Sequence, residues 1–362
     1  MKQRDEQFTI LSALAMLLVI LGHINWDILG KSPLLPYYSY HVMIFVFISG
    51  YFFKPEATDK MLEYIWRKFK KLMVPYFIWN AVYGLLAWGL RFLEFEIGGD
   101  FNLYNLFLAP FMGGHQFMFN AAAWFVPALF LFEVVNIIIV KALKILHFDN
   151  EYILAAVYIF AGVLVVALAM RGSVYDYYKI PGRMMIMAPA FALGRLYKIK
   201  IKQYDTMPSV IYIPVVVLLS FVMVRTHPGL NYSAVWVTGF TSTVFTPIVT
   251  MILGIAFWLR VSKLLYMLLS KIGGEIRRFV LRMGSNTYAI MMHQLIGFFF
   301  VNTIYAIMRY LNVGFVRLFD MSAYHSDIYY TFVPGGEIWK LVYVLAGIAI
   351  PLMIQRACEK EY

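Results

Sequence analysis

The chain alternates between long apolar runs and short polar segments that are often cationic. The first run extends from Phe8 to Gly22 without a charged residue and follows a charged leader at residues 1–7. Runs of this kind approach the roughly 20 residues that a helix needs to cross a bilayer. The pattern predicts about ten spanning helices, near residues 8–29, 39–53, 72–92, 122–140, 151–170, 182–197, 208–225, 240–260, 285–309 and 337–355. Two of them, 39–53 and 182–197, are short and would need flanking residues to span.

The composition supports this interpretation. The 362 residues are 62% hydrophobic and only 14% charged, whereas soluble domains usually have about 25% charged residues. No hydrophilic stretch is long enough to bury a core of its own. We therefore expect an all-α, polytopic integral membrane protein, with a single transmembrane domain over residues 1–362.

The distribution of charge predicts an orientation. Most of the 31 lysine and arginine residues fall in alternate loops, on the N-terminal side of the predicted membrane. By the positive-inside rule, both termini are expected to be cytoplasmic. The net charge of +11 then reflects membrane orientation, and no basic segment has the stacking or groove-reading pattern of a nucleic-acid-binding protein. No clustered Cys and His ligands and no nucleotide-binding glycine loop occur, so no metal site is expected.

One ionisable residue, His23, ends the first apolar run. A helix that begins near Phe8 would place it about 22 Å along the axis, at 1.5 Å per residue. An ionisable group at such a depth costs free energy and indicates a functional site. Asp27 is four residues further on, on the same helix face, so the two side chains predict proton-transfer chemistry. The alternative is an interfacial histidine that only faces lipid headgroups.

Three further residues are unexpected in apolar surroundings. His41 begins the second run and His293 lies within the ninth, while Arg183 follows Pro181-Gly182 at the start of the sixth. A buried arginine can bind an anion or stabilise an oxyanion. The alternatives are hydrogen-bonded packing for the histidines and an arginine that extends to the interface.

Five segments, in order along most of the chain, resemble the membrane acyltransferase family 3. They are His23 with Tyr40-His41 and FVFISGY at 45–51, KFKKLMVPYF at 68–77, AWFVPAL at 123–129, Arg183 with PAFALG at 189–194, and MGSNTYAIMMH at 283–293. The resemblance is greatest to the short members of the family, such as fucose-4-O-acetylase-like and biofilm-polysaccharide O-acyltransferases.

The resemblance implies transfer of an acyl group, commonly acetyl, from cytoplasmic acyl-CoA to a hydroxyl of an extracytoplasmic glycan or lipid-linked sugar. It also implies a bacterial inner membrane. We expect His23 to act as the general base, with Asp27 as the group that orients it, and Arg183 or His41 to stabilise the oxyanion. A transient acyl-imidazole on His23 is a second route. The oligomeric state is not indicated by the sequence.

Binding residues follow from the same scheme. Side chains expected to contact the sugar are Trp124, Tyr40, Ser49, Tyr51 and His293, and those expected to contact the CoA phosphates are Arg67, Lys68, Lys71, Arg277 and Arg278. The alternatives are aromatic anchors at the interface and cations that contact membrane lipids.

One position departs from the family pattern. Many members have an arginine or lysine eleven residues before the first-helix histidine, whereas this chain has Ser12. Intramembrane histidines on about ten helices also fit a transporter or flippase for a polysaccharide or lipid-linked sugar. A receptor or scaffold, in which His23 would be replaceable, is a third possibility.

Overall fold

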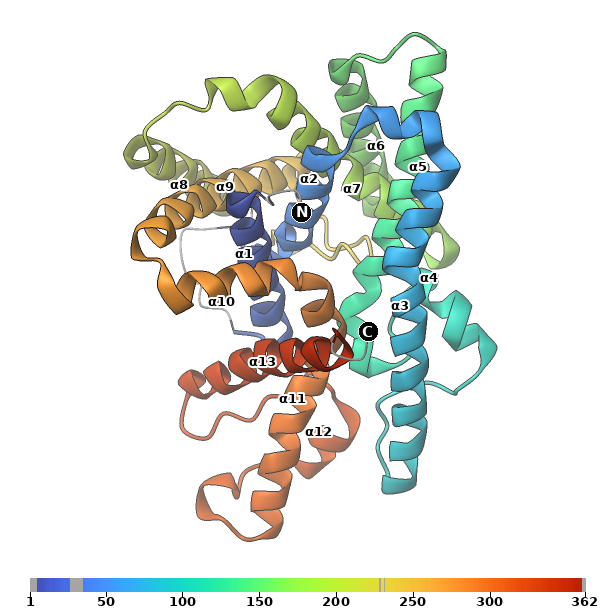
Figure 1. Cartoon of the computed structure of the whole chain (residues 1–362). Coiled ribbons are helices and arrows are strands. Elements are labelled where there is room, and N and C mark those ends of the chain that lie inside the picture. The colour runs from blue at the N-terminus through green and yellow to red at the C-terminus, as the bar shows by residue number, and fades with distance from the viewer. Residues whose placement is uncertain (1–4, 27–34, 228, 231, 360–362) are drawn as a thin grey trace. The chain divides into compact units, whose positions relative to one another are not determined.

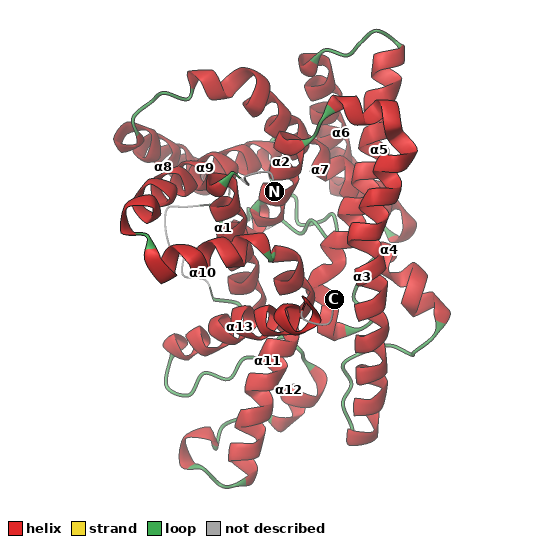
Figure 2. Ribbon diagram, viewed as in Figure 1, coloured by secondary structure: helices red, strands yellow, loops and turns green. Residues whose placement is uncertain are grey.

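Helices form the regular structure of the chain (Figures 1 and 2). The computed structural model describes residues 5–26, 35–227, 229–230 and 232–359. The helices are α1 (Glu6–His23), α2 (His41–Phe52), α3 (Met61–Leu90), α4 (Ala109–Met112), α5 (Phe125–Ile145), α6 (Glu151–Met170), α7 (Lys179–Leu196), α8 (Ser209–Thr226), α9 (Thr246–Ile272), α10 (Gly274–Ser285), α11 (Thr287–Tyr310), α12 (Met321–Ser326) and α13 (Lys340–Glu359). Within the described ranges, β-structure is limited to two isolated bridges. The all-α expectation is confirmed.

Eight helical segments in the described part of the chain are long and apolar enough to cross a membrane. They are Glu6–His23, Pro55–Leu93, Met118–Ile145, Glu151–Met170, Ser209–Thr226, Thr246–Ile272, Thr287–Tyr310 and Glu337–Glu359. The sequence predicts about ten, and the difference lies in the two short runs. Helix α2 has 12 residues, or about 18 Å, against a hydrocarbon core of about 30 Å. Helix α7 contains Pro189 and two buried arginines, Arg183 and Arg195. The polytopic membrane character is confirmed.

The chain folds into two compact units. The first consists of Met1–Leu18, Ile28–Leu72 and Ala128–Gly284, and the second of Val19–Asp27, Met73–Pro127 and Ser285–Tyr362. Boundaries between them fall inside α1, α3, α5 and α10. Each unit has its own packing and its own polar contacts.

In the first unit, α7 packs against both α2 and α6. Helices α2 and α7 approach so closely that a Cβ atom at Gly50 would overlap the Phe191 carbonyl oxygen, and one at Gly194 would overlap the Phe47 carbonyl oxygen. Small residues permit this approach because they have little or no side chain between the backbones. In a membrane such close packing matters, because the hydrophobic effect gives little drive for helix association there. The short helix α2 is thereby held by direct backbone contact with α7.

The second unit is built on α11, which packs against α13 (Figure 1) and against the 3₁₀ segment Met118–Trp124. A Cβ atom at Gly297 would lie 2.6 Å from the Ala346 carbonyl oxygen. The backbones of α11 and α13 therefore meet at a position where only glycine fits.

We expect Gly297→Ala to destabilise the second unit by about 1–3 kcal/mol, the usual cost of overpacking a well-packed contact. The measurement is the midpoint of thermal unfolding of the purified protein in detergent. The matched control is Gly89→Ala in α3, where an added Cβ meets nothing within 4 Å; it should be neutral or slightly stabilising. Equal unfolding midpoints for the two variants would contradict the close packing of α11 on α13.

Candidate active site

His23 is the last residue of α1 and is half-buried. Its Nδ1 lies 3.3 Å from the Oε1 of Gln294, which belongs to α11. Its ring stacks on Tyr329, with centroids 5.5 Å apart. The imidazole is therefore held from two directions by the second unit while part of its surface stays accessible.

Helix α11 presents two consecutive polar side chains, His293 and Gln294, to different neighbours. Adjacent residues of an α-helix point about 100° apart. Gln294 meets His23, whereas the Nδ1 of His293 is hydrogen-bonded to the Tyr83 hydroxyl at 2.6 Å. The ring of Trp79 meets His293 edge to face at 4.4 Å. His293, expected from the sequence to bind the sugar, is buried and in contact with α3.

The segment that carries Tyr329 is fixed by a small polar network. Asn302 donates from Nδ2 to the Tyr330 carbonyl oxygen at 2.8 Å and accepts at Oδ1 from the Tyr343 hydroxyl at 2.6 Å. The same hydroxyl accepts the Phe332 backbone N–H at 2.8 Å. Helices α11 and α13 thus set the position of the ring that stacks on His23.

A buried lysine holds the residues that follow α1. Lys340 Nζ donates to the Asn25 carbonyl oxygen at 2.8 Å and forms an ion pair with Glu337 at 2.7 Å. Asn25 has a left-handed backbone conformation with φ of 49°. The contact fixes the path of the chain just beyond His23. Asp27, the expected orienting group, lies outside the described residues.

Trp124 ends the 3₁₀ segment Met118–Trp124 and is buried. Asn120, in the same segment, donates from Nδ2 to the Asn80 Oδ1 of α3 at 3.2 Å. The same Oδ1 accepts from Gln116 Nε2 at 2.7 Å. A Cβ atom at Gly114 would lie 2.7 Å from the Trp124 Cβ. Trp124 therefore lies in a packed region instead of on an open surface.

Several other predicted residues belong to the first unit. His41 is buried at the start of α2 and donates from Nδ1 to the Tyr37 carbonyl oxygen at 2.9 Å. The Tyr40 hydroxyl accepts from Trp258 Nε1 at 3.0 Å. Arg183, 2% exposed, donates from Nε to the Val235 carbonyl oxygen at 2.7 Å. All three are therefore engaged in contacts within the chain.

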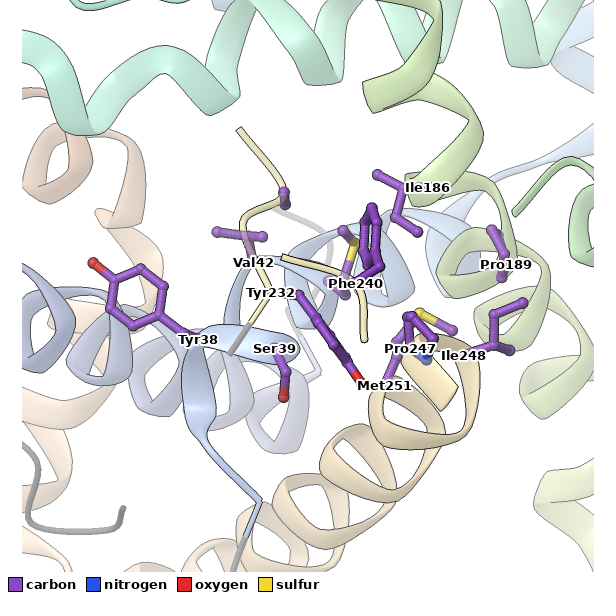
Figure 3. A pocket seen from close by; sticks show the side chains of 12 residues that line it. Tyr38, Ser39, Val42, Ile186, Pro189, Tyr232, Phe240, Pro247, Ile248 and Met251 are labelled. Atoms are coloured by element: carbon purple, nitrogen blue, oxygen red, sulfur yellow. The ribbon is translucent and has the colours of Figure 1, made fainter. Parts of the chain in front are cut away.

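A small pocket lies beside the start of α2. Its lining converges from α2, α7, α9 and the loop that carries Tyr232 and Phe240 (Figure 3). The polar lining residues are Tyr38, Ser39 and Tyr232, and burial raises the pKa of Tyr232 to about 12, so its hydroxyl stays protonated at neutral pH. This lining suits an apolar group better than a sugar.

Ser49 and Lys68 meet on one buried carboxylate that the motifs in the sequence did not single out. Glu133, in α5, accepts hydrogen bonds from the Ser49 and Tyr64 hydroxyls and from Lys68 Nζ at 2.9 Å. Its side chain is 1% exposed, against 28% for Lys68. A buried carboxylate requires such partners. In the sequence, Glu133 could have been noticed as the one charged residue between residues 125 and 140.

The remaining predicted residues have varied surroundings. Tyr51 accepts from Lys202 Nζ at 2.8 Å, and its ring stacks on Phe8. Arg277 pairs with Glu6 at 2.7 Å, which raises the pKa of the guanidinium, and Arg278 pairs with Glu275. Arg67 and Lys71 are exposed on α3. Among the described residues, no group of three or more His, Cys, Asp or Glu side chains is placed to hold a metal ion.

The structure thus groups the predicted residues only in part. Ser49 and Lys68 are brought together in the first unit, and His23 is joined to α11 in the second. Gln294 and Tyr329 are contacts of His23 that sequence reasoning missed. Gln294 had a detectable signal, since it is a polar residue directly after His293 in an apolar run. Tyr329 had none.

Comparison with known protein families matches residues 6–319 to a family described as an acyltransferase domain. The matched range includes most of the chain and contains His23, His41, Arg183 and His293. Comparison with curated proteins and with solved structures finds no match. The family resemblance inferred from the sequence motifs is confirmed.

We expect Lys68→Met to destabilise the first unit, because it leaves the Glu133 charge buried without its cation. Such losses reach about 3–5 kcal/mol for fully buried pairs, and the partial exposure of Lys68 places this one at the lower end. Thermal unfolding in detergent measures the effect. The double variant Lys68→Met/Glu133→Gln removes both charges and should recover much of the stability. If the loss of stability in the double variant equals the sum of the losses in Lys68→Met and Glu133→Gln measured singly, the pair is not coupled.

Proposed function

The chain belongs to the acyltransferase 3 family, and on this premise we propose that it is a membrane O-acyltransferase for glycans. The proposed donor is acyl-CoA, with acetyl-CoA as the simplest form, on the cytoplasmic side. The proposed acceptor is a hydroxyl of an extracytoplasmic glycan or lipid-linked sugar at a bacterial inner membrane. The family match supports acyl transfer, whereas the identities of the donor and the acceptor are part of the proposal.

The observation that carries the proposal is the setting of His23. It is a half-buried imidazole at the end of a membrane helix, with a hydrogen-bond partner on one side and an aromatic ring stacked on another. A general base needs accessibility toward the substrate and a fixed orientation. His293, by contrast, is buried and hydrogen-bonded to Tyr83.

The proposed reaction begins when the acceptor hydroxyl oxygen attacks the thioester carbonyl carbon and His23 takes the hydroxyl proton. The tetrahedral oxyanion then re-forms the carbonyl, the carbon–sulfur bond breaks, and the CoA thiolate takes a proton from the imidazolium. Arg183 or His41 is proposed to stabilise the oxyanion, His41 only with a protonated ring, because the neutral ring donates its Nδ1–H to the Tyr37 carbonyl oxygen. In the alternative route, His23 itself attacks and forms an acyl-imidazole.

The proposed topology has both termini in the cytoplasm, with α2 and α7 as two short additional spans and both units serving one acyltransferase domain. The exposed cations Arg67, Lys71 and Arg278 would then face the CoA phosphates. Lys68 and Arg277 are proposed to shape this surface through their ion pairs with Glu133 and Glu6.

The remaining sugar contacts are proposed for Trp124, Tyr40, Tyr51 and Ser49. Each is buried or hydrogen-bonded within the chain, so a sugar would have to displace these contacts. A transporter of the same fold would move the glycan without cleaving a thioester. The experiment must therefore follow the acyl group.

We expect membranes prepared from cells that produce the protein to transfer label from radioactive acetyl-CoA to cell-envelope glycans, and His23→Ala to lower this transfer by at least about 100-fold. Loss of a general base typically costs about 10²–10⁴-fold. The matched control is His227→Ala, whose ring is hydrogen-bonded to the neighbouring Thr226 hydroxyl.

Expression must be equal for the three proteins. Equal labelling by wild type and His23→Ala would remove His23 from the mechanism. A failure to label with wild type, together with a defect in glycan export when the gene is deleted, would favour the transporter.

A further inference from the structure

Gln294 is buried completely, yet its amide contacts the half-buried ring of His23. Its Oε1 lies 3.3 Å from His23 Nδ1, and its Nε2 has no hydrogen-bond partner among the described residues. The two residues are 271 positions apart in the sequence. A buried polar side chain with such an incomplete set of hydrogen bonds needs an explanation.

The hydrogen bond determines which ring nitrogen of His23 carries the proton. An amide oxygen can only accept, so its partner Nδ1 must donate. In a neutral imidazole the other nitrogen, Nε2, then holds the lone pair and is the basic atom. We propose that Gln294 is a positioning residue that holds His23 in the Nδ1–H tautomer and so makes Nε2 the base. Its catalytic consequence rests on the proposed function.

The neutral amide suits this role better than a carboxylate would. The charged form of a buried acid costs several kcal/mol unless it is paired, and a carboxylate would favour the protonated imidazolium, which cannot accept a proton. Glutamine accepts the same N–H without adding charge. The imidazole can therefore stay neutral and basic.

The amide is also held in place. Gln294 lies three residues before Gly297, where the α11 backbone touches α13. Tyr329 stacks on the histidine ring and is fixed through Asn302 and Tyr343. Since the His23 ring and the Gln294 amide are positioned by the same pair of helices, the direction of His23 Nε2 is fixed with them.

The opposite amide orientation makes a different prediction. It would donate an N–H to Nδ1, move the imidazole proton to Nε2, and remove the base. A carboxylate at position 294 distinguishes the two arrangements, because it can accept from Nδ1 and cannot donate to it.

The first test uses ¹⁵N-histidine labelling and magnetic resonance of the whole protein in lipid bilayers, with the His23 signals identified by their loss in His23→Gln. We expect neutral His23 to be protonated at Nδ1 in the wild type and in Gln294→Glu, and to shift toward Nε2 in Gln294→Met. Met291→Leu, a buried apolar change on the same helix, is the control and should leave the tautomer unchanged. A wild-type proton on Nε2, or an unchanged tautomer in Gln294→Met, would overturn the proposal.

The second test is kinetic. Gln294→Met should lower kcat at least about tenfold, because a base held in the wrong tautomer loses activity, with little change in KM for acyl-CoA. Met291→Leu should retain wild-type kcat. A wild-type kcat in Gln294→Met would contradict the role. If the wild type transfers no acyl group, the proposed function fails, while the tautomer measurement still decides the assignment of Gln294.

Discussion

The structure depends on one constraint: polar groups inside an apolar interior must find their partners within the chain. In a lipid environment no water replaces a missing hydrogen bond, and an unpaired buried charge costs several kcal/mol. Helices satisfy the backbone locally. Side chains satisfy the constraint through partners far away in the sequence. Glu133, for example, accepts hydrogen bonds from Ser49, Tyr64 and Lys68. Departures from the rule, such as Gln294 Nε2, are therefore informative.

The fold was largely predictable because its signals are local. The length of an apolar run gives a helix, and eight of the predicted runs correspond to helices long enough to span. The two short runs could be recognised from the sequence as too short to span without flanking residues. What holds the short helix α2 in place could not be predicted. Its twelve residues are held by contacts between Gly50 and Phe191 and between Phe47 and Gly194, and such pairings require the three-dimensional arrangement.

The candidate site was predictable only in its central residue. His23 could be identified because a single ionisable group ends an apolar run. Its partner was sought nearby at Asp27, since helix geometry makes only i+3 and i+4 neighbours visible from sequence. Asp27 lies outside the described residues, and a contact that the structure does describe is Gln294, 271 residues away. Lys68 was selected for its charge, and its hydrogen bond to Glu133 depends on how α3 and α5 pack.

The most direct test of the role of His23 is a product balance with the purified protein, acetyl-CoA and an acceptor glycan, in the absence of any other protein. If His23 is the base of a glycan acyltransferase, one free CoA appears for each acyl group found on the glycan, and both products disappear together in His23→Ala. Release of CoA without acylated glycan, or equal product formation by the variant, would contradict the assignment of His23 as the base of a glycan acyltransferase.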